Sequence, residues 1–336
     1  MANEHPADGE HDMTTRPPAT AVTRQDLRTG DRVALLVNPA ARSTGDRASI
    51  AAAKRTLEQR YRVELIAPQQ VDELNAAARE AGASCAAIIV AGGDGTLHRV
   101  INAIDGQAAP IGLLPLGTGN DFARALHLPT DSPGAAARIL DGQIRQIDLV
   151  AVNSRLFCTV GVLGLAAEAT LAFDRLLRPG AWSRPAMRAL GGWSYRIAGL
   201  AALLSRGSRL ERVAIETDET VSGENGALGA QSIYGAFITN TTLLGGGMVV
   251  PIDADMADGQ FEIACIDAMS RARLHWAFLC LANGWRVPDG VLRVVRTARA
   301  VITCERRLPF AADGEVLCEE SRFEVVVRPG ALSVIC

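Results

Sequence analysis

Residues 86–121 read AAIIVAGGDGTLHRVINAIDGQAAPIGLLPLGTGND and contain two short apolar runs, each followed by a glycine-bearing turn. The runs cover residues 86–90 and 111–114. Continuous apolar runs of this length are typical of strands that are buried in a parallel sheet. A helical stretch separates them, and this order of strand, turn, helix and strand predicts a parallel α/β sheet with helices on both faces.

The same alternation extends toward the N-terminus. An apolar run at residues 33–37 stops at Asn38-Pro39, and a helix at 46–60, a strand at 62–67 and a helix at 71–81 follow. We therefore predict an N-terminal α/β domain with glycine-rich nucleotide loops over residues 29–150. Residues 1–28 are rich in Pro, Thr and charge and lack apolar periodicity, which predicts a disordered tail.

The hydrophobic pattern of the sequence changes after residue 150. Short alternating segments at 156–160, 212–217, 232–239, 261–266, 300–304 and 323–328 predict a β-rich, antiparallel, β-sandwich-like C-terminal domain over residues 151–329. A helical insert at 166–204 and a helix near 271–283 interrupt it. The final segment, residues 330–336, is compatible with a strand that returns to the first domain and completes it.

The composition argues against several classes of protein, namely those that bind nucleic acid, depend on disulfides or zinc, or span a membrane. The chain has 48% hydrophobic and 21% charged residues, a globular balance, and a formal net charge of −3, which argues against a nucleic-acid partner. Seven scattered cysteines without a CxxC pair, and five histidines without a metal-ligand spacing, favour reduced thiols over disulfides or zinc. The polar N-terminus is not a signal peptide, and the apolar runs fall short of the roughly 20 residues that span a bilayer. We expect a soluble cytoplasmic protein.

Three turns carry the candidate chemistry, because ligands of open α/β sheets bind beyond the carboxyl ends of the strands. They are Asn38-Pro39, residues 92–96 and residues 117–121. Glycines let the backbone approach a phosphate, and a carboxylate such as Asp94 among phosphates is expected where a divalent cation has to be placed. Alternatively, each cluster is an ordinary strand-to-helix turn in which Asp94 and Asp121 cap helices. Two such turns on consecutive connections favour the nucleotide site.

The motifs Asn38-Pro39, Gly92-Gly-Asp-Gly-Thr-Leu97 and Pro115-Leu-Gly-Thr-Gly-Asn-Asp-Phe-Ala-Arg124 resemble, in order and spacing, the catalytic domain of diacylglycerol and related lipid kinases. The likeness continues at Asn240, residues 245–247, Pro251, Asp258-Gly259 and Asp313-Gly-Glu315. It implies an active site in the cleft between the two domains, with Mg²⁺ and ATP. The implied ATP ligands are Asn38, Pro39, Gly92, Gly93, Asp94, Gly95, Thr96, Leu97, Gly117, Thr118, Gly119, Asn120 and Asp121.

The resemblance also implies roles in the second domain. Asp258 would bind a structural Mg²⁺ through its carboxylate, and Asp255 and Gln260 through their main-chain carbonyls. Glu315 would be the catalytic base, with Asp94 as the second catalytic residue. From the residues alone, the Asp313-Gly-Glu315 turn is better explained as an acidic surface turn, and only the resemblance makes Glu315 the candidate base. Ala67 stands where bacterial members have a threonine that touches ATP.

We expect an ATP-dependent lipid kinase that phosphorylates a hydroxyl of a lipid such as diacylglycerol or a sphingoid base, at the inner face of a membrane. The alternatives are a kinase similar to NAD kinases with a soluble substrate, or a non-catalytic sensor of nucleotide or lipid. A homo-oligomer is compatible with the sequence. The insert mixes arginine and tryptophan, which suits either anionic headgroups or an ordinary solvated helix face; these residues are Arg175, Arg178, Trp182, Arg184, Arg188, Trp193 and Arg196.

Overall fold

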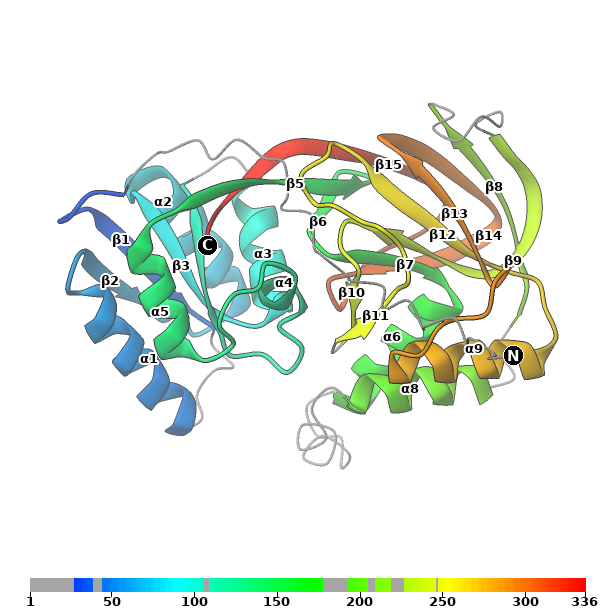
Figure 1. The fold of residues 1–336 in the computed structure, drawn as a ribbon. Helices are drawn as coiled ribbons and strands as arrows, with labels where there is room; N and C mark the ends of the chain where they lie inside the picture. The colour runs from blue at the N-terminus through cyan, green and yellow to red at the C-terminus, as the bar shows by residue number, and fades with distance from the viewer. Residues whose placement is uncertain are drawn as a thin grey trace, which may run out of the picture.

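The structure is a computed structural model that describes residues 27–38, 44–105, 109–177, 193–204, 209–218, 227–245 and 247–336. Two parts lie side by side, an α/β part and a β-rich part, and a pair of long strands connects them (Figure 1). The predicted two-domain architecture, with a β-rich second domain, is confirmed.

The first part is built on a sheet of parallel strands. β1 (Arg32–Val37) pairs with β2 (Arg62–Ile66) and β3 (Ala87–Gly92), and β3 pairs with β4 (Ile111–Pro115). Side chains of successive strand residues alternate between two apolar clusters, so both faces of the sheet are covered. This explains why β1, β3 and β4 are apolar runs, whereas β2 at the edge of the sheet carries Arg62 and Glu64.

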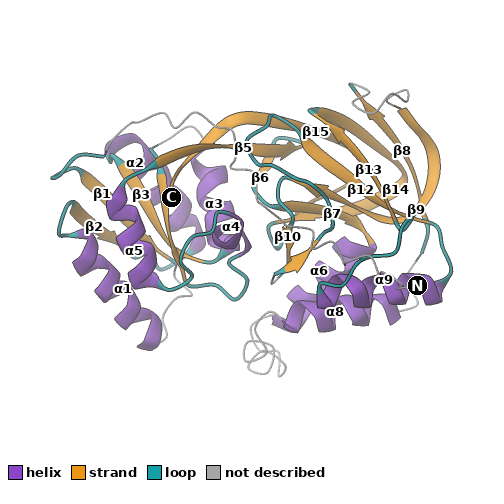
Figure 2. Cartoon of the chain, viewed as in Figure 1, coloured by secondary structure: helices purple, strands orange, loops and turns teal. Residues whose placement is uncertain are grey.

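Helices cover both faces of this sheet (Figure 2). On one face lie α2 (Val71–Ser84) and α3 (Asp94–Ile104), and on the other α1 (Thr44–Leu57) and α5 (Ser132–Asp141). The short helix α4 (Asp121–Ala125) follows β4. The helix α3 begins one residue after β3 and α4 follows β4 after a five-residue turn, so both begin at the carboxyl end of the sheet.

The second part consists mainly of antiparallel strands around a second apolar core. Its strands are β5 (Ile144–Val152), β6 (Arg155–Phe157), β7 (Val160–Gly164), β8 (Glu211–Thr217), β9 (Ala227–Thr239), β12 (Phe261–Asp267), β13 (Leu292–Thr297), β14 (Arg299–Ala312) and β15 (Glu315–Ile335). A small hairpin is formed by β10 (Leu243–Leu244) and β11 (Met248–Val249). Three helices form a layer against one side of the strands, α6 (Leu165–Leu177), α8 (Trp193–Leu204) and α9 (Arg271–Asn283) (Figure 1).

The last strand belongs to both parts. Residues 315–326 of β15 pair with β14, whereas Val334 pairs in parallel with Ile111 of β4. The strand β5 runs antiparallel along β15 from Val152 to Ile144. The two parts therefore share one continuous set of backbone hydrogen bonds.

The structure bears on two further predictions, the disordered tail and the helical insert. Leu27, which we assigned to the disordered tail, is 5% exposed and packs in the core beside β1, so order begins before residue 29. The predicted helical insert corresponds to α6 and α8, while residues 178–192, with most of its arginine and tryptophan residues, lie outside the described residues, as do residues 1–26.

Among the described helices, none combines the length and apolarity that a bilayer span requires.

Candidate active site

The two glycine turns pack against each other through their backbones. A Cβ added to Gly93 would lie 2.8 Å from Gly117 Cα, and one added to Gly117 would lie 2.5 Å from Gly93 Cα. The Leu116 N–H donates to the Gly92 carbonyl oxygen at 2.9 Å. Glycine at both positions is therefore required by close approach, and the turns that follow β3 and β4 form one continuous backbone surface.

Side chains of the predicted ATP ligands hold this surface in place. The Asn38 Nδ2 group, at the end of β1, donates to the Thr96 hydroxyl. Asn120 closes its own turn, since its Oδ1 accepts from the Gly117 N–H and its Nδ2 donates to the Gly117 carbonyl, both at 2.9 Å. Thr118 is exposed at the rim, whereas the Leu97 side chain is buried in the core behind α3. Pro39 lies outside the described residues.

Asp94 links the two turns. Its Oδ2 accepts from the Asp121 N–H and its Oδ1 from the Phe122 N–H, each at 3.2 Å, so its carboxylate caps the neighbouring helix α4. Burial, followed by the negative charge of Asp121, raises the pKa of Asp94 to about 6, against the opposing effect of these two N–H groups. The carboxylate is thus held among backbone donors at the carboxyl end of the sheet, and its ionisation is costly.

Asp121 in turn connects this region to the second part of the chain. It is buried, and its Oδ1 accepts from the Gly247 N–H of the β10–β11 hairpin at 2.9 Å. Gly245 and Gly247 have φ values of 50° and 88°, which favour glycine. A Cβ on Gly247 would also lie 3.0 Å from an Arg124 Nη1 atom. The hairpin therefore rests directly on α4.

Glu315 reaches the same site from the second part. A Cβ added to Gly95 would lie 3.1 Å from Glu315 Oε1, so this carboxylate lies against the first glycine turn. Arg99, one turn further along α3, donates to both Glu315 oxygens at 3.2 and 3.3 Å. The ion pair is part-exposed, and it orients the carboxylate along the side of α3.

Asp313 anchors the turn that carries Glu315. Its buried carboxylate accepts from the Thr159 N–H (2.9 Å) and hydroxyl (2.6 Å), from the Cys158 N–H (3.1 Å), and lies 3.0 Å from His98 Nδ1. Although burial acts to raise the pKa of Asp313, His98 and these donors outweigh it and lower the pKa below its ordinary value. The position of Glu315 is therefore set by a buried polar cluster between α3 and the second part.

The predicted magnesium ligands lie in a different environment. Asp258 accepts from the Gln260 N–H at 2.9 Å through Oδ1, and its Oδ2 is paired with Arg296. Arg296 also lies 3.3 Å from Glu262, whose pKa is raised to about 7 because it is buried. The Asp255 carboxylate accepts from the Ala257 N–H at 3.1 Å.

A guanidinium and a magnesium ion would compete for the same Asp258 carboxylate. The part of the chain that the structure describes contains no group of three or more acidic, histidine or cysteine side chains that could hold a metal ion. In this structure the Asp258 carboxylate is paired with Arg296, which supplies the positive charge there. The magnesium ligands named from the sequence stay a prediction.

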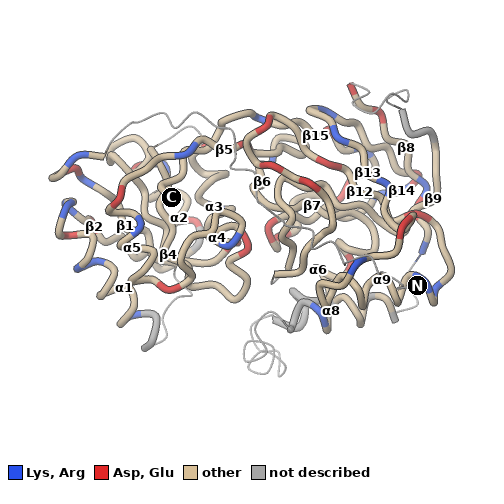
Figure 3. The backbone as a smooth tube through the Cα atoms, in the orientation of Figure 1, with Lys and Arg blue, Asp and Glu red and all other residues tan. Residues whose placement is uncertain are grey.

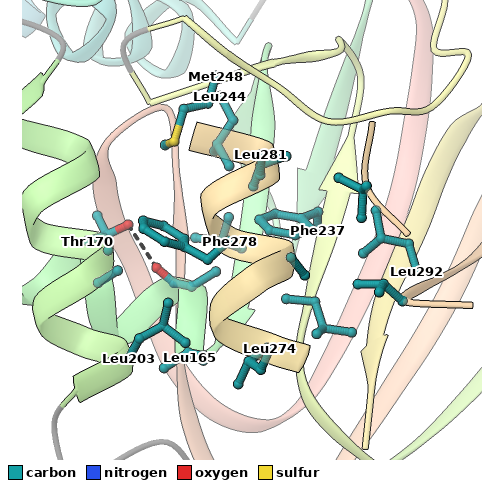
Figure 4. A pocket seen from close by; sticks show the side chains of 18 residues that line it. Leu165, Thr170, Leu203, Phe237, Leu244, Met248, Leu274, Phe278, Leu281 and Leu292 are labelled. Carbon is teal, nitrogen blue, oxygen red and sulfur yellow. Dashed lines mark hydrogen bonds between the residues drawn. The ribbon is translucent and has the colours of Figure 1, made fainter. Parts of the chain in front are cut away.

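An apolar cavity of about 130 Å³ lies in the second part, lined by residues of α6, α8, α9, the β10–β11 hairpin and the strands beneath them (Figure 4). Its hydroxyl-bearing lining residue, Thr170, donates to the Ala166 carbonyl of its own helix at 3.3 Å. Leu244 and Met248 form the wall on the side of the hairpin that contacts Asp121. The cavity and the glycine turns are therefore joined by a single hairpin.

The sequence analysis predicted that the glycine turns and Glu315 belong to one site. It did not predict Arg99, His98 or the cavity. Helical spacing from Gly95 places His98 and Arg99 on one side of α3, which was the available signal for the two residues. The cavity had no comparable signal, because its lining comes from segments separated by more than 100 residues.

Comparison with known proteins adds independent findings. Residues 32–152 match the model of the diacylglycerol kinase catalytic domain, and residues 184–336 match that of a YegS C-terminal NAD kinase β-sandwich-like domain. A diacylglycerol kinase of Mycobacterium tuberculosis is 31% identical over 259 residues, covering 74% of this chain and 76% of the relative. A YegS-like lipid kinase of Pseudomonas aeruginosa is 31% identical over 75% of this chain and 77% of the relative. The crystal structure of a diacylglycerol kinase from Bacillus anthracis shares the fold, with a TM-score of 0.71, 19% identity and coverage of 91% of this chain and 96% of that one.

Proposed function

The chain belongs to the diacylglycerol kinase family, and from this premise we propose that it transfers the γ-phosphoryl group of ATP to a hydroxyl of a membrane lipid of the diacylglycerol or sphingoid type. The observation that carries the proposal is the position of Glu315, whose carboxylate lies against the turn at Gly95. A proton acceptor and a phosphate-binding turn from different parts of the chain meet there.

In this proposal MgATP is the phosphoryl donor, and its phosphates lie against the paired turns in a cleft between the two parts. Backbone N–H groups at the start of α3 and the positive end of the helix would bind phosphate oxygens. Asp94 holds the start of α4 against the first turn, and its negative charge would be available to the metal of MgATP. The metal enters with the nucleotide, and no step passes through residues 255–260.

Glu315 would accept the proton of the lipid hydroxyl as its oxygen attacks the γ-phosphorus and the bond to the β-phosphate oxygen breaks. Arg99 holds the carboxylate in position, and Asp313 fixes the turn beneath it. General base catalysis of this kind contributes about 10²–10⁴-fold to the rate. Positioning and charge neutralisation account for the rest.

The apolar cavity supports a lipid acceptor over a soluble one. Cavities of about this size, roughly 150 Å³, take up small hydrocarbons in other proteins, so this one has room for part of an acyl chain. Its link to Asp121 through the hairpin would place the headgroup end of that lipid near the glycine turns.

The test is an assay of radiolabelled phosphate transfer from ATP to a panel of lipids in mixed micelles, with lipid-free and NAD reactions as controls. We expect transfer to a lipid, and a loss of 10²–10⁴-fold, about the contribution of a general base, in Glu315→Gln. Glu319→Gln, an exposed glutamate on the same strand, is the matched control and should retain activity. Phosphorylation of NAD without any lipid would refute the lipid assignment, and near-normal turnover in Glu315→Gln would refute the role of Glu315.

A further inference from the structure

The helical layer of the second part has an apolar outer face. Ile197 and Leu200 on α8, Trp276 and Leu279 on α9, and Trp285 just after α9 are each between 39% and 55% exposed. Each helical pair is three residues apart and therefore lies on one side of its helix. The rings of Trp276 and Trp285 are 6.1 Å apart. We call these five residues the α8–α9 face.

This face is not the usual polar exterior of an amphipathic helix. The opposite side of α9, formed by Leu274, Ala277, Phe278 and Leu281, lines the apolar cavity (Figure 4). The helix is thus apolar on both sides, a pattern that calls for an apolar neighbour on each. The cavity is the neighbour on one side, and among the described residues the other side has no apolar neighbour that covers it.

The charges around the face indicate what that neighbour is. The segments 193–204 and 271–290 contain four arginines (196, 271, 273 and 286) and one acidic residue, Asp289 (Figure 3). Asp289 pairs with Arg286 at 3.2 Å, which leaves an excess of three positive charges on a chain whose net charge is −3. Tryptophan and arginine together are the side chains enriched where proteins meet the headgroup region of a bilayer. Each arginine near an anionic surface strengthens binding by about fivefold.

We infer that the α8–α9 face docks on an anionic lipid bilayer, so that a lipid acyl chain passes from the bilayer into the cavity behind α9. The inference deepens the proposed function and rests on it for the identity of the cavity's ligand. The docking itself depends only on the exposed apolar side chains and the arginines around them.

The experiment measures co-sedimentation with vesicles of phosphatidylcholine alone and of phosphatidylcholine with phosphatidylglycerol, together with the shift of tryptophan fluorescence. The wild type should bind the anionic vesicles more tightly and show a blue shift. Trp276→Ser/Trp285→Ser should lose at least tenfold in vesicle affinity, and Arg271→Gln about fivefold on anionic vesicles alone. Leu65→Ser, which removes an equally exposed leucine from β2, is the matched control and should bind normally. Leu279→Gln, with one exposed side chain changed, provides a second variant should the double variant unfold.

A kinase assay separates this inference from the proposed function. With a short-chain diacylglycerol dispersed as monomers, the double tryptophan variant should turn over at the wild-type rate, and only its rate on vesicles should fall. Normal vesicle binding by the double variant and by Leu279→Gln would overturn the docking inference, even if the kinase activity is present. A dimer that the double variant converts to monomer, with vesicle binding unchanged, would also overturn it. Vesicle binding through this face without phosphorylation of any lipid would support docking and refute the proposed function.

Discussion

Replacing Asp94 by asparagine should make the folded protein more stable at neutral pH while removing a group of the proposed active site. The native carboxylate is buried beside Asp121, and its pKa is raised from 3.8 to about 6. Asparagine has the same shape as the protonated acid, and its one acceptor oxygen can serve one of the two N–H groups of Asp121 and Phe122, so the loss of the other hydrogen bond offsets part of the gain. The substitution therefore removes a buried charge without opening a cavity.

The sign of the effect follows from the raised pKa. Between pH 3.8 and about 6 the folded protein binds more protons at Asp94 than the unfolded chain does, so stability falls as the pH rises through this window. The cost is absent below pH 3.8 and complete above about pH 6. Since one pKa unit corresponds to about 1.4 kcal/mol, the full cost is about 3 kcal/mol.

Denaturant unfolding of wild type and Asp94→Asn at pH 4.5, 5.5, 6.5 and 7.5 tests this reasoning. The free energy of unfolding of the variant, relative to wild type, should increase by about 2 kcal/mol between the lowest and the highest pH. Asp218→Asn, at an exposed position, is the control and should show no such trend. A difference that stays constant with pH, or that falls as the pH rises, would show that Asp94 does not ionise at a cost in the native state.

Three further predictions concern backbone contact and charge. Gly93→Ala should lower the free energy of unfolding by about 1–3 kcal/mol and weaken ATP binding, both measurable by thermal shift, because its Cβ would lie 2.8 Å from Gly117 Cα. Asp313→Ala should lower the free energy of unfolding by about 3–5 kcal/mol at pH 7, because the buried donors of Thr159 lose their acceptor. Since the native pKa of Asp313 is lowered, that contribution is lost as the pH falls below about 4, so unfolding curves of wild type and variant should converge in acid. Arg296→Gln should lower the melting temperature and make it respond to Mg²⁺, whereas that of wild type should not change with a chelator; a wild type destabilised by chelation would contradict the assignment of Arg296 as the cation beside Asp258.

Local sequence patterns were sufficient for most elements of the first part. Buried parallel strands are continuous apolar runs, and β3 and β4 are each followed by a turn whose glycine is required by close backbone contact, Gly93 and Gly117 respectively. The helix at residues 271–283 was predicted with the bounds that the structure has. The full length of β15 could not be predicted, because no local pattern says that one strand will pair first with β14 and then with β4.

The site residues that lie in the turns after the parallel strands could be predicted from the sequence. Asn38, Asp94 and Asn120 meet because the carboxyl ends of parallel strands lie along one edge. Glu315 is positioned by a contact with Arg99, more than 200 residues away in the chain, and from the residues alone an acidic surface turn was the favoured reading. That Arg296 would pair with Asp258 depends on the register of β12 and β13, which the sequence does not encode locally.

The shared strand β15 has a consequence for how the protein is made. The edge of the first sheet at Ile111 is completed by Val334, and the Cys336 N–H donates to the Gln143 carbonyl. During synthesis, the strands β1 to β4 leave the ribosome more than 200 residues before their last partner does. The edge at β4 therefore remains unpaired until Val334 has been synthesised, so a chain truncated before this residue should be aggregation-prone rather than a shorter enzyme.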